Sequence, residues 1–164
     1  MNAVTSNAPR QVGDLMAIDP VVVRADEPLV EAARLMDTRH VHGLPVVDGA
    51  STLVGVISQT DLLRARATEY LWANWADLRV RHLMTSPALT VHGDAPLALA
   101  ARKMERHHVH RLVVVAAEDD GLPIGVLSTT DLVRAMSAAA AAEPTPAAPA
   151  APDAPDVEGT PPGA

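Results

Sequence analysis

The apolar and polar positions along this chain follow one pattern, and the pattern occurs twice. In each copy, apolar residues stand at i, i+3, i+4 and i+7, which is the spacing of a single helix face. The residues with this spacing are Leu29, Ala32, Ala33 and Met36 in the first copy and Leu97, Ala100, Ala101 and Met104 in the second. Each copy therefore predicts a helix with one buried face.

Short apolar runs before and after each of these helices predict strands. The expected strands are residues 21–23, 44–47 and 53–58 in the first copy, and residues 89–91, 112–115 and 124–128 in the second. The polar stretches "DGAST" and "EDDG" predict the turn between the last two strands of each copy. Before each helix, an aspartate predicts the N-cap and a proline predicts the first turn; these residues are Asp26 with Pro28, and Asp94 with Pro96.

The segment "GVISQTDLLRA", residues 55–65, recurs as "GVLSTTDLVRA", residues 125–135. The two copies align with an offset of 68 residues that becomes 70 after a longer turn, and roughly half of the aligned positions are identical. The repeated unit is strand, helix, strand, strand, helix, which is too small to close a hydrophobic core alone. The sequence therefore predicts an α/β (α+β) fold in which two copies pack sheet to sheet.

The repeats and the changes in composition between them divide the chain into five parts. They are an N-terminal extension (1–11), the first repeat (12–66), a helical linker (67–79), the second repeat (80–137) and a disordered tail rich in alanine and proline (138–164). The linker holds every aromatic residue, namely Tyr70, Trp72 and Trp75, and places Leu71, Trp75 and Leu78 on one helical face. Two interpretations stay open: the linker covers the protein's own sheet, or it anchors a partner or a second copy.

Composition and charge exclude several classes of function. The net charge of −7 becomes −3 without the four carboxylates of the tail, which argues against a nucleic-acid-binding surface. The chain has no cysteine, so disulfides, thiolate chemistry and a cysteine-type zinc site are excluded. It has no apolar leader and no apolar run of membrane-spanning length. We therefore expect a soluble, cytoplasmic protein that contacts neither nucleic acid nor membrane.

The repeated joint "SQTD" or "STTD" has the form of a capping box, in which serine and aspartate satisfy the free amides at a helix start. The two joints are residues 58–61 and 128–131. Capping does not explain why Gly55 and Gly125 stand three residues before each serine. It also does not explain why His42 and His110 open the neighbouring strand in both copies.

With these motifs, the pair of repeats resembles a tandem CBS (cystathionine-beta-synthase-type) module, also called a Bateman module, over about residues 12–136. The stretch "RHHVHRLVVV" together with "GVLSTTDLVRA" is especially similar to a repeat in the gamma subunit of AMP-activated protein kinase. The resemblance implies two β-α-β-β-α repeats with pseudo-two-fold symmetry and regulatory binding of adenosine compounds in the clefts between them, without catalysis. It also implies a homodimer acting on an unknown effector protein. The expected ligand is AMP, ADP or ATP, with S-adenosylmethionine as a further possibility, and no cofactor is required.

The candidate ligand-binding residues follow from the chemistry of a nucleotide. A carboxylate can accept hydrogen bonds from both ribose hydroxyls, whereas hydroxyls and amides at a helix start can bind phosphate oxygens. An arginine can add a charged fork to a phosphate. The candidates are Asp61 and Asp131 for the ribose, Ser58, Thr60, Ser128 and Thr130 for the phosphate, His42 and His110 at the strand entrances, and Arg111 as the charged fork.

The position that matches Arg111 in the first repeat is occupied by Gly43, which predicts two unequal clefts. The cleft served by Arg111 should prefer the more charged ligand. The sequence alone does not assign each residue to a cleft, because sites of this family draw on both repeats. The aspartates and histidines also fit purely structural roles, in helix capping and at a strand entrance.

Other functions remain as alternatives or are disfavoured. An interaction scaffold with vestigial clefts is the main alternative, and a Ser-His-Asp hydrolase is disfavoured because neither serine lies in a Gly-x-Ser-x-Gly elbow. Metal binding is disfavoured because the spacing of His107, His108 and His110 points the imidazoles to different faces. The four repeat-equivalent methionines predict core filling; they are Met16, Met36, Met84 and Met104.

Overall fold

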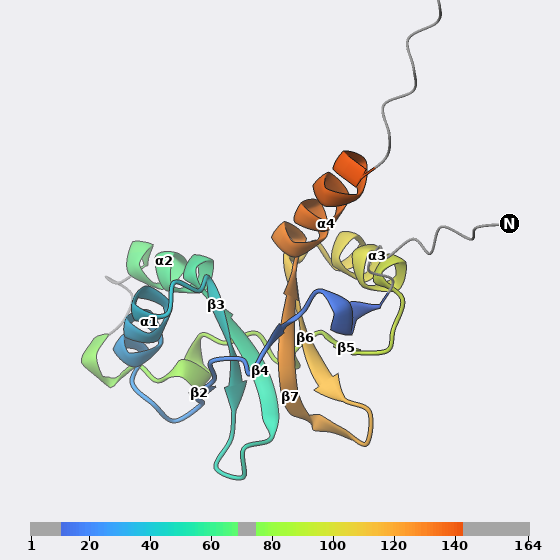
Figure 1. Ribbon diagram of the computed structural model, residues 1–164. Helices are drawn as coiled ribbons and strands as arrows, with labels where there is room; N and C mark the ends of the chain where they lie inside the picture. Colours follow the sequence, from blue (N-terminus) through green and yellow to red (C-terminus); the bar gives the residue numbers. More distant parts are fainter. Residues whose placement is uncertain (1–10, 69–74, 143–164) are drawn as a thin grey trace, which may run out of the picture.

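Two β-sheets, each packed against two helices, form the described part of the computed structural model, which is residues 11–68 and 75–142 (Figure 1). The first half consists of β2 (Val23–Arg24), β3 (Gly43–Val47), β4 (Leu53–Ser58), α1 (Leu29–Thr38) and α2 (Gln59–Ala67). The second half consists of β1 (Ala17–Ile18), β5 (Thr90–His92), β6 (Arg111–Ala116), β7 (Asp119–Ser128), α3 (Leu97–His107) and α4 (Thr129–Ala142). Short 3₁₀ helices η1 (Val12–Asp14), η3 (Trp75–Asp77) and η4 (Val80–His82) lie in the connecting segments.

The strand order is the same in both halves apart from one added strand. β2 runs parallel to β3, which pairs antiparallel with β4, and β5, β6 and β7 repeat this arrangement. β1 adds to the free edge of β7 in antiparallel register. β4 and β7 contact each other in the middle of the molecule (Figure 1). The predicted α/β fold of two β-α-β-β-α repeats packed sheet to sheet is therefore confirmed.

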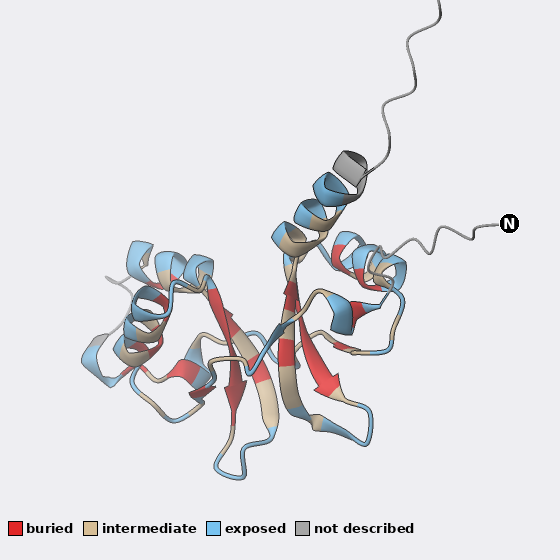
Figure 2. Cartoon of the chain, in the orientation of Figure 1, coloured by how far each residue is buried: buried red, intermediate tan, exposed pale blue. Residues whose placement is uncertain are grey.

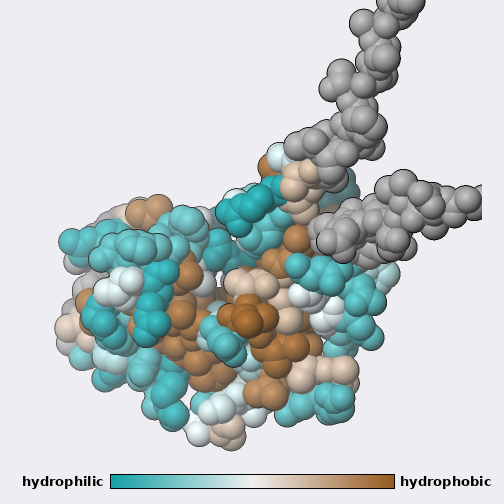
Figure 3. All heavy atoms as spheres, in the orientation of Figure 1, coloured by the Kyte–Doolittle hydropathy of each residue, from teal (hydrophilic) through white to brown (hydrophobic). Residues whose placement is uncertain are grey.

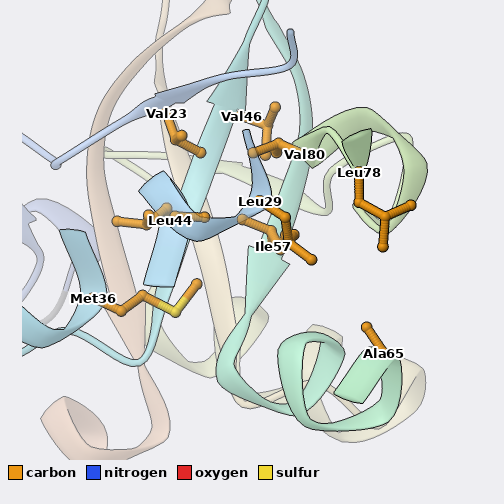
Figure 4. Close-up of a cluster of buried hydrophobic side chains, with 10 residues drawn as sticks. Val23, Leu29, Met36, Leu44, Val46, Ile57, Ala65, Leu78 and Val80 are labelled. Carbon is orange, nitrogen blue, oxygen red and sulfur yellow. The ribbon is translucent and has the colours of Figure 1, made fainter. Parts of the chain in front are cut away.

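Each half has its own hydrophobic core, which lies between its sheet and helices (Figure 2). Of the four residues predicted to face inward in α1, Leu29, Ala32 and Met36 are at most 4% exposed, whereas Ala33 is only partly buried. Figure 4 shows Leu29 and Met36 beside Leu44 and Ile57 of the sheet. Ala100 and Met104 of α3 are also buried, but Ala101 is exposed. Since full burial of one such large side chain contributes about 1.5–3 kcal/mol, these faces fix the helices on the sheets.

The segment at the start of each repeat packs against the sheet and helices of the other repeat. We call residues 12–18 and 78–85 the crossing segments. Val12, fully buried, lies in the core of the second half, and its N–H donates to the carbonyl of Ala95 at 2.9 Å. Val80, equally buried, lies in the core of the first half, and its N–H donates to the carbonyl of Glu27 at 3.0 Å (Figure 4). Each half of the structure therefore includes the crossing segment that belongs to the other repeat in the sequence.

The crossing segments explain the glycines that capping left unexplained. A Cβ atom on Gly55 would lie 2.7 Å from the carbonyl oxygen of Thr85. A Cβ atom on Gly125 would lie 2.7 Å from Sδ of Met16 and 2.9 Å from the carbonyl oxygen of Ala17. All three distances are shorter than real Cβ contacts allow, so glycine at these positions lets a crossing segment lie directly on β4 or β7.

The predicted helix starts were wrong by two residues. The N-cap residues of α1 and α3 are Pro28 and Pro96, and neither helix has a side-chain cap. In α1, the N–H of Leu29 donates instead to the carbonyl of Leu78 at 2.9 Å, so the crossing segment replaces the expected aspartate. Asp26 pairs with Arg24 at 3.3 Å rather than with the helix.

The linker is only partly within the described residues. Tyr70, Leu71 and Trp72 lie outside them, and the proposed aromatic face therefore stays a prediction. Leu78 is 7% exposed and packs in the core of the first half. At the other end of the chain, the predicted start of the disordered tail at residue 138 was wrong, because α4 continues into the alanine run as far as Ala142, in line with the high helix propensity of alanine. Residues 143–164 of the predicted tail lie outside the described residues.

Candidate functional site

The repeated joint forms the same hydrogen-bonded cap at the start of both α2 and α4. The N–H and the hydroxyl of Ser58 donate to Oδ2 of Asp61 at 2.8 and 2.6 Å, and the N–H of Asp61 donates weakly to the Ser58 oxygen at 3.4 Å. The corresponding distances at Ser128 and Asp131 are 2.9, 2.6 and 3.4 Å. The capping interpretation is therefore confirmed for both copies.

Capping uses only one carboxylate oxygen of each aspartate, and the second oxygens of Asp61 and Asp131 differ in their interaction partners. Oδ1 of Asp131 lies 3.8 Å from Nη1 of Arg134, one helical turn along α4. Oδ1 of Asp61 has no hydrogen-bond or ion-pair partner among the residues that the structure describes. The half-buried Asp61 carboxylate therefore keeps an acceptor that a ligand can use.

Asp61 lies in a cleft of about 360 Å³ between the two halves. This size falls in the range of small-molecule sites, about 300–1,000 Å³. We call it the Asp61 cleft. The first half contributes the start of α2 and the strand entrance at His42, and the second half contributes the strand entrance at residues 108–111. Aliphatic groups of Val56, Ala88, Leu89 and Val109 form the apolar part of the lining.

Six of the nine candidate residues are together in this cleft: Ser58, Thr60, Asp61, His42, His110 and Arg111. The other three, Ser128, Thr130 and Asp131, lie at the junction of β7 and α4 in the second half. The sequence alone did not show which residues share a cleft. The structure places Arg111 in the same cleft as Asp61. Ser58 uses its hydroxyl hydrogen within the cap, so the exposed hydroxyl of Thr60 is the better donor for a ligand.

Sequence analysis did not identify several of the residues that line the cleft. Arg64 stands three residues after Asp61, and Arg134 stands at the same place after Asp131, so the repeat itself carried this signal. His108 was considered only as a metal ligand; it caps α3 in a left-handed conformation with φ of 54° and lines the cleft. Thr85, Ala88 and Leu89 come from the approach to β5. Only knowledge of the crossing segments could have placed them there.

The cleft is positively charged inside an acidic protein. Its charged lining residues are Arg64 and Arg111 against Asp61 alone, with the imidazoles of His42, His108 and His110 around them. Arg111 is half-buried, and desolvation lowers its pKa from the ordinary value, although a guanidinium stays protonated. Within the described residues, the Arg111 side chain has no carboxylate partner. An anion bound in the cleft would relieve the cost of this unpaired, partly desolvated cation.

The histidines that open the strands also support the helix starts through their backbone. The N–H of Gln59 donates to the carbonyl of His42 at 3.1 Å, and the N–H of Thr129 donates to the carbonyl of His110 at 2.9 Å. Both imidazoles are exposed. These histidines therefore join each strand entrance to the adjacent helix, and their side chains remain free to face a ligand.

Two negative findings apply to residues 11–68 and 75–142. No group of three or more histidine, aspartate and glutamate side chains there is arranged to hold a metal ion. None of the helices in this part of the chain combines the length and the apolar character that a membrane span requires.

Comparison with known families identifies the class of protein. The sequence model of the CBS domain matches residues 12–68 and 80–138, and since these matches cover more than half of the chain, it belongs to the CBS domain family. Among solved structures, the chain is similar to the CBS-pair protein CBSX2 from Arabidopsis thaliana, with 33% identity, a TM-score of 0.68, and coverage of 81% of this chain and 98% of that one. The chain is thus a tandem CBS pair, as its motifs indicated.

Some of the similar structures contain adenosine compounds. CBSX2 in complex with AMP is 36% identical, with a TM-score of 0.69 and coverage of 79% of this chain and 98% of that one. The CBS domain pair of protein MJ0100, in complex with 5′-methylthioadenosine and S-adenosyl-L-methionine, is 25% identical, with a TM-score of 0.70 and coverage of 78% and 96%.

Two of the curated relatives are much longer proteins than this chain. A homoserine O-acetyltransferase of Methanocorpusculum labreanum is 32% identical over 124 residues, which are 76% of this chain and 24% of that protein. The uncharacterized protein MJ1232 of Methanocaldococcus jannaschii is 30% identical over 127 residues, with coverage of 77% and 40%. The chain therefore spans less than half the length of these two relatives.

Proposed function

We propose that this protein is a regulatory CBS pair without catalytic activity, and that it binds an adenosine nucleotide, AMP, ADP or ATP, in the Asp61 cleft. One observation carries the proposal: a carboxylate and an arginine line the same cleft from opposite halves, and within residues 11–68 and 75–142 one carboxylate oxygen has no partner and the arginine has no carboxylate partner. A nucleotide has matching groups, because its ribose donates hydrogen bonds and its phosphate is an anion. The AMP complex of the similar CBSX2 supports the same ligand class.

Each part of the ligand has a partner in the cleft. Oδ1 of Asp61 accepts from the ribose hydroxyls, and the aliphatic lining at Val56 and Leu89 packs against the base. The phosphate lies toward Arg111 and the Thr60 hydroxyl. The excess of arginine over aspartate favours a phosphate over S-adenosylmethionine, which carries a sulfonium cation.

The output of binding is a change in how the two halves are arranged. Asp61 belongs to the first half and Arg111 to the second, so a ligand that contacts both stabilises the arrangement in which they are close. A ligand biases such an equilibrium only by its different affinity for the two arrangements. The effector that responds is a separate protein.

The assembly that transmits this change is a homodimer. α2 and α4 present apolar side chains to solvent at repeat-equivalent positions: Leu63 is 70% exposed and Val133 is 61% exposed, and Met136 on α4 is 70% exposed. Figure 3 shows a further apolar area in the middle of the face drawn, between the two halves. Exposed apolar side chains that gather on one surface are typical of interfaces.

Isothermal titration calorimetry of the full chain with AMP, ADP, ATP and S-adenosylmethionine tests the proposal. We expect heat with the phosphate-bearing ligands and a loss of affinity of roughly 10- to 100-fold in Asp61→Asn, since charge-assisted hydrogen bonds contribute about 1.5–3 kcal/mol. Asp131→Asn is the matched control. It changes an equivalent cap, with hydrogen bonds of 2.9 and 2.6 Å, but leaves the Asp61 cleft intact.

Two results would contradict the proposal. If none of the four ligands produces heat, the clefts are vestigial and the protein is an interaction scaffold. If Asp61→Asn and Asp131→Asn lose affinity equally, the effect comes from the weakened helix cap and not from contact with the ligand.

A further inference from the structure

Gly43 and Arg111 are repeat-equivalent residues, and in the structure they are in direct contact. Each is the first residue of its strand, β3 or β6. A Cβ atom built on Gly43 would lie 2.4 Å from Nη1 of Arg111 and 3.2 Å from its guanidinium carbon Cζ. The guanidinium therefore crosses from the second half and rests on the backbone of the first half, in the space where a side chain at position 43 would begin.

The backbone does not require glycine at this position. Among the described glycines none has a positive φ, so the conformation of Gly43 is one that other residues adopt. The other close neighbour of the built Cβ is the backbone carbonyl oxygen of Ile57, at 3.0 Å, which is less free to move than the end of the arginine side chain. Glycine at position 43 thus leaves space for two neighbours, and the guanidinium of Arg111 is the closer of them.

Resting on the proposed function, we propose that Gly43 and Arg111 act together as a selector: the gap at Gly43 positions the one arginine, and this decides which side of the pseudo-two-fold axis binds the phosphate. By the symmetry of the repeats, an arginine at position 43 would face Asp131 as Arg111 faces Asp61. The Cβ atom of any such side chain would already overlap Nη1 of Arg111, so the two arginines would compete for this space.

Exchanging the two residues tests this selector. The double variant Gly43→Arg with Arg111→Gly moves the arginine to the other repeat at unchanged composition, and ADP is the probe. In the wild type, we expect Asp61→Asn to weaken ADP binding by at least tenfold and Asp131→Asn to leave it nearly unchanged. In the exchanged protein we expect the reverse, because the phosphate now binds on the Asp131 side.

A single methyl group gives a second test that does not depend on the double variant folding. Gly43→Ala puts a Cβ atom in the space of Nη1 and 3.0 Å from the backbone carbonyl oxygen of Ile57. The flexible guanidinium moves away, and the backbone at Ile57 has to give by only a few tenths of an ångström. We expect roughly tenfold weaker ADP binding and unchanged binding of adenosine, followed by ligand-observed NMR, because adenosine lacks the phosphate. Gly49→Ala is the matched control, since its Cβ would meet only Arg24, at an ordinary 3.5 Å.

The outcomes separate this inference from the function on which it rests. A wild type that binds no nucleotide overturns both. If the wild type binds ADP but the exchanged protein still depends on Asp61, or if Gly43→Ala binds ADP like the wild type, the selector is refuted while nucleotide binding stands. Equal losses for ADP and adenosine in Gly43→Ala also refute it, because a general disturbance of the cleft would then explain the effect.

Discussion

The close approach of the crossing segment to β4 predicts a large loss of stability in Gly55→Ala. The added Cβ would lie 2.7 Å from the carbonyl oxygen of Thr85 and 2.9 Å from Sδ of Met84. The carbonyl oxygen belongs to backbone and cannot swing aside. It also accepts a hydrogen bond from the N–H of Val56 at 3.0 Å, and the N–H of Thr85 donates back at 2.8 Å. The methyl group must therefore push the crossing segment off the sheet.

The size of the effect follows from these contacts. Forcing one extra methyl group into a packed site costs about 1–3 kcal/mol, and weakening the hydrogen bonds at Thr85 adds about 0.5–1.5 kcal/mol. We therefore expect the free energy of unfolding to fall by about 2–4 kcal/mol. For a chain of this length, this corresponds to a drop of roughly 5–15 °C in the thermal midpoint.

Urea unfolding of the full chain, followed by circular dichroism, measures this loss directly. Gly49→Ala is again the control, and we expect it to change stability by less than about 0.5 kcal/mol, as exposed substitutions usually do. Gly125→Ala should resemble Gly55→Ala, because its Cβ would lie 2.9 Å from the backbone carbonyl oxygen of Ala17. If Gly55→Ala is as stable as Gly49→Ala, the crossing segment does not pack as described and this reasoning is wrong.

Two further predictions concern the strands and the assembly. Val113→Pro removes the N–H that donates to the carbonyl of Leu89 at 3.1 Å, and we expect the free energy of unfolding to fall by more than about 1 kcal/mol in the same assay. The reverse change at the matching position, Pro45→Val, should lower it less. Equal losses for the two variants would contradict the argument. Leu63→Asp should convert the homodimer, of about twice the 17.2 kDa chain mass, to a monomer in light scattering coupled to size-exclusion chromatography. Leu122→Asp, at another exposed apolar residue, should leave the dimer intact, and a monomeric wild type would contradict the proposed assembly.

Local patterns predicted most of the fold. The spacing of Leu29, Ala32 and Met36 specified the buried face of α1 because a helix face depends only on neighbouring turns. The cap of Ser58 on Asp61 was likewise predictable, since both residues lie within one turn. The start of α1 was not, because the N–H of Leu29 finds its partner at Leu78, far along the chain.

The residues that line the cleft were predicted only in part, because the cleft is formed by segments that are far apart in the sequence. Asp61 and Arg111 were each singled out by residue type, but a duplicated sequence has the same pattern in both copies and does not show which copy faces which. Thr85 lies beside β4 because of the crossing segment, and no periodicity near Thr85 indicates this. Gly43 attracted attention as a missing arginine, and only the structure shows that the space is filled from the other repeat.

The crossing segments also constrain how the chain is synthesised. When residues 12–68 have left the ribosome, the core of the first half still lacks Leu78 and Val80, and Val12 has no core to enter. Neither half can finish folding until translation has passed the start of the second repeat, so a nascent chain arrested between the repeats should remain sensitive to protease. For the same reason, two fragments cut between the repeats should be unstable separately and regain native structure only when they are mixed.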